Sequence, residues 1–166
     1  MAGLVDWESF GVMTGGASGA LTGLLFVAVS LNADRIARHP GLRAIAAQTL
    51  VLFMAPLAMA TLLLTPRQPG WALGTELMTA GLCGGLGLLV IGRRKRGPGP
   101  ADARLAGLFD RRDTGIVVMV LMVVGGAVLA SGTPEGLYAL LPASLVAFVS
   151  GVLSAWNFLL PPPAML

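Results

Sequence analysis

The sequence holds few of the residues from which catalytic sites and water-facing surfaces are usually built. Of its 166 residues only 11% are charged and 6% are aromatic, and there is one cysteine and one histidine. A single cysteine forms no disulfide within the chain, and a single histidine, His39, cannot supply a His-rich zinc site. No nucleophile–histidine pair is recognisable. We therefore predict neither an enzyme nor a bound metal or cofactor, and we expect Cys83 to be a small packed residue.

Hydrophobic residues, in contrast, make up 55% of the chain, and its mean hydropathy is +0.82. Soluble domains carry about 25% charged residues, so a chain this apolar favours a bilayer as its solvent. A helix needs about 20 apolar residues to cross a membrane. Five runs approach or meet that length, at 10–31, 44–64, 71–91, 115–131 and 137–160. The prediction is an all-α, polytopic integral membrane protein, with one helical bundle spanning residues 1–166.

Basic residues are distributed unevenly between the predicted loops. Ten of the eleven Lys and Arg residues lie in loops 32–43 and 92–114, which share one side if all five spans cross, whereas the other side carries Arg67 alone. Loops rich in Lys and Arg stay in the cytoplasm. The pattern therefore predicts an outside N-terminus and a cytoplasmic C-terminus. Trp7, Trp71 and Tyr138 then fall at outer helix ends, where aromatic residues are enriched.

The long basic loop contains two features of its own. Arg93, Arg94, Lys95 and Arg96 directly follow the third run, and such clusters attract anionic lipid headgroups or a partner protein. Segment 101–113 has apolar residues on one helical face and charged residues largely elsewhere. We expect it to form a short helix in the membrane interface.

Small residues recur every four positions in two of the runs. The first run has Gly11, Gly15, Gly19 and Gly23, a repeated GxxxG pattern that lets another helix backbone approach closely. The last run has a matching stripe, which comprises Ala139, Ala143, Ala147, Gly151 and Ala155. The pattern is compatible with packing inside one subunit or with contacts between copies of a homo-oligomer, and periodicity does not separate the two.

Polar groups at membrane depth are the candidate functional residues. Glu76 is the one acidic or basic residue well inside a predicted span, about 7.5 Å along the helix from Trp71. It is a candidate ion or proton site, or it turns to the outer surface or pairs with Arg67. A second group, near the inner ends of the spans, is expected to form interhelical hydrogen bonds: Ser30, Asn32, Gln48, Thr49, Ser154 and Asn157. Pro56 is expected to kink the second span.

Several segments between residues 7 and 78 resemble a known group of proteins. They are the glycine-rich stretch 15–32, the motif His39-Pro40-Gly41-Leu42-Arg43, the stretch 48–52 and Gly74-Thr75-Glu76-Leu77. Together they resemble small bacterial membrane proteins labelled "modulator of FtsH protease". The better-known modulators carry paired acids within their spans, which this chain lacks. The resemblance implies a multi-pass protein of the bacterial inner membrane and little about mechanism.

Two functions remain open on these residues. The first is a homo-oligomeric bundle with a channel or transport-like role for ions or protons, in which Glu76 binds the ion or proton. The alternative is a regulatory protein without transport, which docks a partner such as a membrane-anchored protease through Arg93, Arg94, Lys95 and Arg96. Neither reading involves nucleic acid.

Overall fold

The computed structural model describes residues 7–93 and 111–159, and these form helices joined by short turns. The helices are α2 (Glu8–Leu31), α3 (Ala33–Arg38), α4 (Pro40–Leu63), α5 (Gly70–Arg93), α6 (Arg111–Ala130), the 3-10 helix η2 (Pro134–Ala139) and α7 (Leu140–Leu159). Five stretches are long and apolar enough to cross a membrane: α2, α4, α5, α6 and the unit made of η2 and α7. The predicted all-α bundle with five candidate spans is confirmed.

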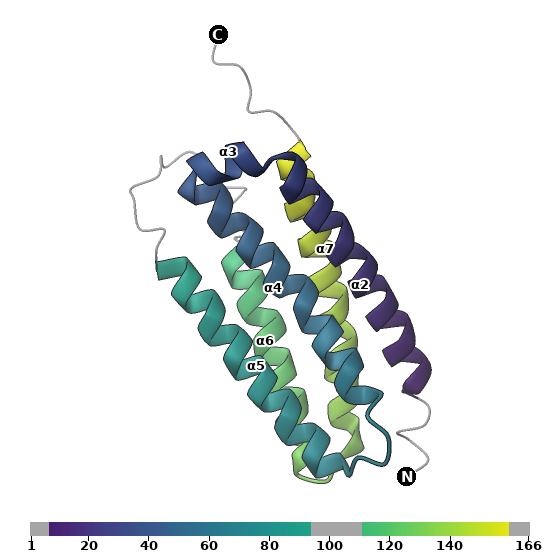
Figure 1. Cartoon of the computed structure of the whole chain (residues 1–166). Coiled ribbons are helices and arrows are strands. Elements are labelled where there is room, and N and C mark those ends of the chain that lie inside the picture. Colours follow the sequence, from purple (N-terminus) through teal and green to yellow (C-terminus); the bar gives the residue numbers. More distant parts are fainter. Residues whose placement is uncertain (1–6, 94–110, 160–166) are drawn as a thin grey trace.

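The long helices run up and down in turn, so the described loops gather at two ends of the bundle (Figure 1). We call the end that carries α3 the inner end, because Arg35, Arg38 and Arg43 lie there. The opposite end, with the 64–69 turn and η2, is the outer end. At the outer end Trp7 makes edge-to-face contacts with Phe10 and Tyr138, with ring centroids 5.4 and 5.3 Å apart. These contacts hold the start of α2 against η2.

α4 is the central helix of the bundle, because it packs against α2, α5, α6 and α7. It runs without a break through Pro56, whose missing N–H leaves the Leu52 carbonyl without its usual donor. At the neighbouring residue, the buried Ser18 hydroxyl of α2 donates a hydrogen bond to the Phe53 carbonyl. A donor from α2 thus reaches the α4 backbone at the place where the proline weakens its own hydrogen bonding.

Some helices extend beyond the predicted spans, and the largest difference lies in the first loop. Residues 33–38 form α3, and α4 begins at Pro40 rather than at 44. Proline suits the first turn of a helix because no N–H is needed there, and Ile36 buries its side chain beneath α3. α6 likewise begins four residues before the predicted 115. The expected interfacial helix at 101–113 lies outside the described residues, apart from 111–113, which belong to α6.

The glycine column of α2 divides between two surroundings. A Cβ placed on Gly11 would contact Leu63 and Leu64 of α4 at ordinary distances, and one on Gly15 would lie 3.0 Å from the Ala60 side chain. A Cβ on Gly19 or Gly23 would have no atom within 4 Å. The reason is geometric: a step of four residues advances about 40° around a helix of 3.6 residues per turn. The column therefore leaves α4 after its first half and turns outward.

The most extensive contact between helices of the described bundle is that of α5 with α6, and it includes close approaches of the two backbones. A Cβ added to Gly74 would lie 2.5 Å from the Ala130 nitrogen and 2.6 Å from the Gly126 carbonyl oxygen. A Cβ added to Gly126 would in turn lie 2.6 Å from the Gly74 carbonyl oxygen. Near the outer end Gly125 lies against Gly136 and Ala139 of η2. In lipid, where apolar surfaces gain little from leaving the solvent, such close van der Waals packing drives helix association. Close backbone packing therefore holds α6 against both α5 and η2.

The small-residue stripe of α7 packs inside the chain. Ala143, Ala147 and Gly151 are buried, and the Phe53 ring of α4 fills the space above Gly151. Ala139 and Ala155 at the two ends of the stripe are half-buried. For α7, then, the choice between packing inside the subunit and packing between subunits is settled in favour of the former.

The contact between α5 and α6 makes a stability prediction. Gly74→Ala forces two backbones apart, and overpacking of this kind typically costs about 1–3 kcal/mol. Thermal unfolding in mild detergent should show a clearly lowered midpoint. Gly87→Ala, on the same helix with no atom within 4 Å of the added Cβ, should unfold at the wild-type temperature or slightly above it. Equal midpoints for both variants would contradict the close approach of α5 to α6.

Candidate functional site

A groove lies between α4 and α5, open on one side. α4 lines it with Met54, Leu57, Ala58, Thr61 and Leu62, and α5 with Glu76, Thr79, Ala80 and Cys83. Its volume is about 610 Å³. Most of the lining is apolar, so the polar atoms that do face it define what the groove can bind.

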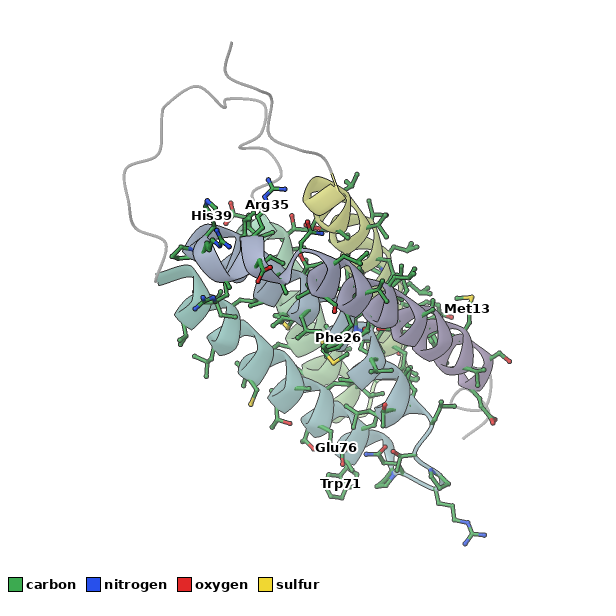
Figure 2. The ribbon with its side chains drawn as sticks, turned by 45° about the horizontal axis from the view of Figure 1, so that its top comes forward. Met13, Phe26, Arg35, His39, Trp71 and Glu76 are labelled. Atoms are coloured by element: carbon green, nitrogen blue, oxygen red, sulfur yellow. The ribbon has the colours of Figure 1, made fainter. Side chains whose placement is uncertain are left out.

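Glu76 lies near the outer end of this groove, one and a half turns into α5 from Trp71 (Figure 2). Its carboxylate accepts a hydrogen bond from the Gln68 side-chain amide. The suggested pairing of Glu76 with Arg67 is wrong among the described residues. Arg67 has a left-handed backbone, with φ of 57°, and its exposed side chain makes no recorded ion pair. The turn that contains Arg67 instead presents the next residue, Gln68, to Glu76.

Gln68 was missed by sequence reasoning. The only indication in the sequence is its place in the Pro-rich turn, eight residues before Glu76. Its amide N–H donates to the Glu76 carboxylate, while its carbonyl oxygen is buried without a hydrogen-bond partner among the described residues. Buried amide oxygens are usually satisfied, so the Gln68 oxygen is an unused acceptor beside the Glu76 carboxylate.

The remaining polar atoms of the groove are mostly engaged with their own helices. Thr61 donates to the Leu57 carbonyl at 2.9 Å, and Thr79 donates to the Glu76 carbonyl at 2.9 Å. Cys83 lies about two turns farther along α5 and is exposed, so the expectation of a packed core cysteine was wrong. The groove thus offers one carboxylate near its mouth and one thiol near mid-membrane.

The inner polar residues do not join into one hydrogen-bonded cluster in the described part of the chain. Gln48, Thr49 and Ser154 are buried, but Thr49 donates to Ile45 of its own helix at 2.9 Å, and Asn32 donates to Ala28 of its own helix at 3.0 Å. Ser30 is exposed, and the Asn157 side chain is outside the described residues. Three buried hydroxyl oxygens have no recorded partner: those of Thr14, Thr22 and Ser154.

The remaining candidate residues are the α2 glycines, the basic cluster that follows α5, and His39. Gly11 and Gly15 contact α4, whereas Gly19 and Gly23 face outward, so their proposed role in joining subunits stays a prediction. The side chains of Arg93, Arg94, Lys95 and Arg96 lie outside the described residues. His39 is exposed, with its Nδ1 2.9 Å from the Arg35 carbonyl oxygen. Within residues 7–93 and 111–159, no three His, Cys, Asp or Glu side chains gather as metal ligands would.

Comparison of the chain with protein-family models, with curated proteins and with solved structures gives no match. The resemblance to the bacterial group therefore remains a prediction. What the structure itself supports is a multi-pass membrane protein with a carboxylate-bearing groove.

Proposed function

We propose that this membrane protein binds and transfers protons at Glu76, and that it does so as a homo-oligomer. The observation that carries the proposal is a carboxylate held by Gln68 at the mouth of a groove that runs into the membrane-spanning part of the bundle. Ionisable side chains at membrane depth are rare and mark ion or proton pathways.

The depth of Glu76 follows from helix geometry. α5 has 24 residues, which at 1.5 Å per residue makes about 36 Å, whereas the hydrocarbon core is about 30 Å thick. A centred α5 therefore extends about 3 Å beyond the core at each end. Glu76 is six residues, or about 9 Å, from Gly70, and so lies about 6 Å inside the hydrocarbon.

The chemistry of the groove favours a proton over a metal cation. Hard cations such as Ca²⁺ take six to eight oxygen ligands, whereas the groove has one carboxylate, and its two threonine hydroxyls donate to their own helices. A proton needs a single carboxylate and one supporting group. Gln68 is that group, because its amide can donate to the charged carboxylate or, after rotation by half a turn, accept from the protonated one.

The oligomer supplies what one chain lacks. Beyond Glu76 the described groove wall is apolar except for Thr79 and Cys83, and the Thr79 hydroxyl donates to its own helix. One chain therefore gives no continuous polar path, and the groove is open on one side. α2 presents an outward face with Gly19 and Gly23, which can pack closely on another copy. We expect proton transfer to involve this contact between copies.

Proton flux into proteoliposomes tests the role of Glu76. Wild-type protein should dissipate an imposed pH gradient faster than empty liposomes. Glu76→Gln removes the group that exchanges the proton, so it should lower the rate at least about tenfold, to that of empty liposomes. Glu135→Gln is the matched control, because it removes an exposed acid at the same end of the bundle, outside the groove. Wild-type flux equal to that of empty liposomes, with correctly inserted protein, would reject proton transfer and favour the partner-docking role. Wild-type flux above that level but unchanged in Glu76→Gln would reject the role of Glu76.

Cross-linking in membranes tests the role of the α2 face. Gly19→Leu should lower the yield of cross-linked dimer and the proton flux together, because the side chain blocks close packing between copies, whereas its Cβ has no neighbouring atom of its own chain within 4 Å. Ala17→Leu lies at the same depth on the other flank of α2 and should change neither. A dimer yield that Gly19→Leu leaves unchanged would show that copies do not meet through this face.

A further inference from the structure

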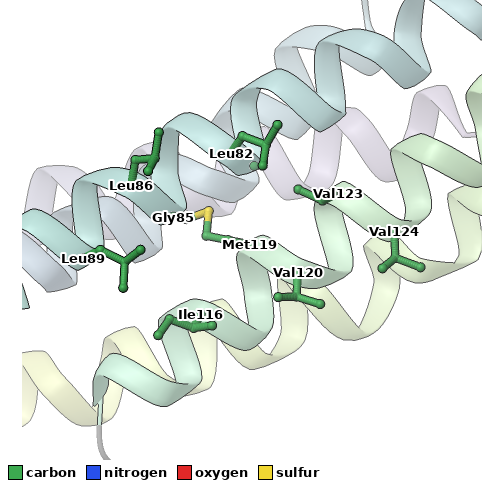
Figure 3. Close-up of a pocket in the computed structure, with 10 residues that line it drawn as sticks. Leu82, Gly85, Leu86, Leu89, Ile116, Met119, Val120, Val123 and Val124 are labelled. Carbon is green, nitrogen blue, oxygen red and sulfur yellow. The ribbon is translucent and has the colours of Figure 1, made fainter.

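A second groove lies between α5 and α6 (Figure 3) and shares no lining residue with the Glu76 groove. One wall is formed by Leu82, Leu86 and Leu89 of α5, and the other by Ile116, Val120 and Val124 of α6. Gly81, Gly85 and Met119 form the floor. The volume is about 280 Å³ and the exposed lining is almost wholly apolar. This groove therefore takes an apolar occupant.

The groove is held open by glycine. Gly85 has no side chain between the two walls, and Met119 lies beside it across the floor (Figure 3). Leu86, on the wall, is 62% exposed, so the walls stand out from the bundle toward lipid. From Gly81 to Leu89 the groove is about 12 Å long, close to one leaflet's half of a hydrocarbon core of about 30 Å. A single acyl chain fits this length, whereas a helix about 10 Å wide is too broad to enter between the two walls.

Two arginine positions lie on the helices at the inner end of this groove. Arg93 ends α5 four residues after Leu89, and Arg112 stands in the first turn of α6, four residues before Ile116. Residues four apart share a helix face, so both arginine positions continue the two groove walls toward the inner end. An apolar groove that ends between two arginine positions matches an anionic phospholipid, with its chain in the groove and its phosphate at the inner end.

We propose that the α5–α6 groove is a binding site for one anionic phospholipid of the inner leaflet. The site is independent of the proposed proton transfer at Glu76. Gly81 links the groove to the α5–α6 contact, because it packs against Met119 and Val123 of α6 and also lines the groove floor.

Native mass spectrometry of the full chain in detergent, titrated with phosphatidylglycerol or with phosphatidylcholine of the same chains, tests the site. Wild type should retain one phosphatidylglycerol per chain, with a preference over phosphatidylcholine of about fivefold for each arginine. Gly85→Leu fills the groove, and its Cβ meets Met119 at an ordinary 3.7 Å, so the variant should fold and lose the bound lipid. Gly87→Leu, with no atom within 4 Å, should bind as wild type does.

A second variant tests the headgroup contact at the inner ends of the two helices. Arg93→Gln with Arg112→Gln should abolish the preference for phosphatidylglycerol and leave the weaker binding common to both lipids. Unchanged lipid retention in Gly85→Leu would overturn the site. A second outcome would also overturn it. If Gly85→Leu lowered the dimer signal in the same spectra without losing lipid, and Gly87→Leu did not, a second copy of the chain would occupy the groove. Equal retention of the two lipids by wild type would overturn the role of the arginines.

Discussion

The contact between the α5 and α6 backbones at Gly74 and Gly126 is the constraint on which the rest of the bundle depends. Helices in lipid gain little from hiding apolar surface, so their association relies on the number of atoms they bring into van der Waals contact. Here two glycines let the backbones meet, with a Cβ on Gly74 only 2.6 Å from the Gly126 carbonyl oxygen. The pair also receives η2 through Gly125 and Gly136, and that contact aligns α7 for its packing against α4.

α4 connects this pair to the other half of the molecule. On one side it meets α5 along the Glu76 groove, and on the other it receives Ser18 of α2 and places the Phe53 ring on Gly151 of α7. The two grooves follow from this arrangement. Between α4 and α5 the packing is looser and leaves room for a carboxylate, whereas between α5 and α6 it is tight and leaves only a shallow apolar channel on the lipid side.

Length and hydropathy were sufficient to predict the five spans, because the bilayer imposes both on any helix that crosses it. The tight contacts were harder to predict. The regular glycines of α2 suggested the closest packing, yet their four-residue spacing drifts around the helix, so Gly19 and Gly23 face away from the chain. Gly126, which makes a closer contact, stands in no repeat. Whether a small residue faces lipid, a neighbouring helix or another copy depends on crossing angles that a single sequence does not contain.

Among the groove residues, too, some could be predicted from the sequence and others could not. Glu76 was recognisable from the sequence because a charge is costly inside a hydrocarbon core. Its partner was not, because the choice between Arg67 and Gln68 depends on one left-handed residue in the turn. Cys83 was expected to be packed, since small residues in apolar runs usually are, but the looser α4–α5 contact leaves it exposed. The inner polar residues were placed at the correct end, but each described hydrogen bond from Asn32 and Thr49 returns to its own helix.

Thiol labelling from one side of the membrane tests most directly whether the bundle spans the bilayer with its α3 end inside. In a Cys83→Ala chain, single cysteines at Ala37 on α3 and at Thr133 before η2 can be labelled with a thiol reagent that does not cross membranes. We expect Thr133→Cys to react in intact cells and Ala37→Cys to react only after the membrane is opened. Reaction of both cysteines in intact cells would contradict a bundle that spans the bilayer between these two ends, and the reverse pattern would contradict its orientation.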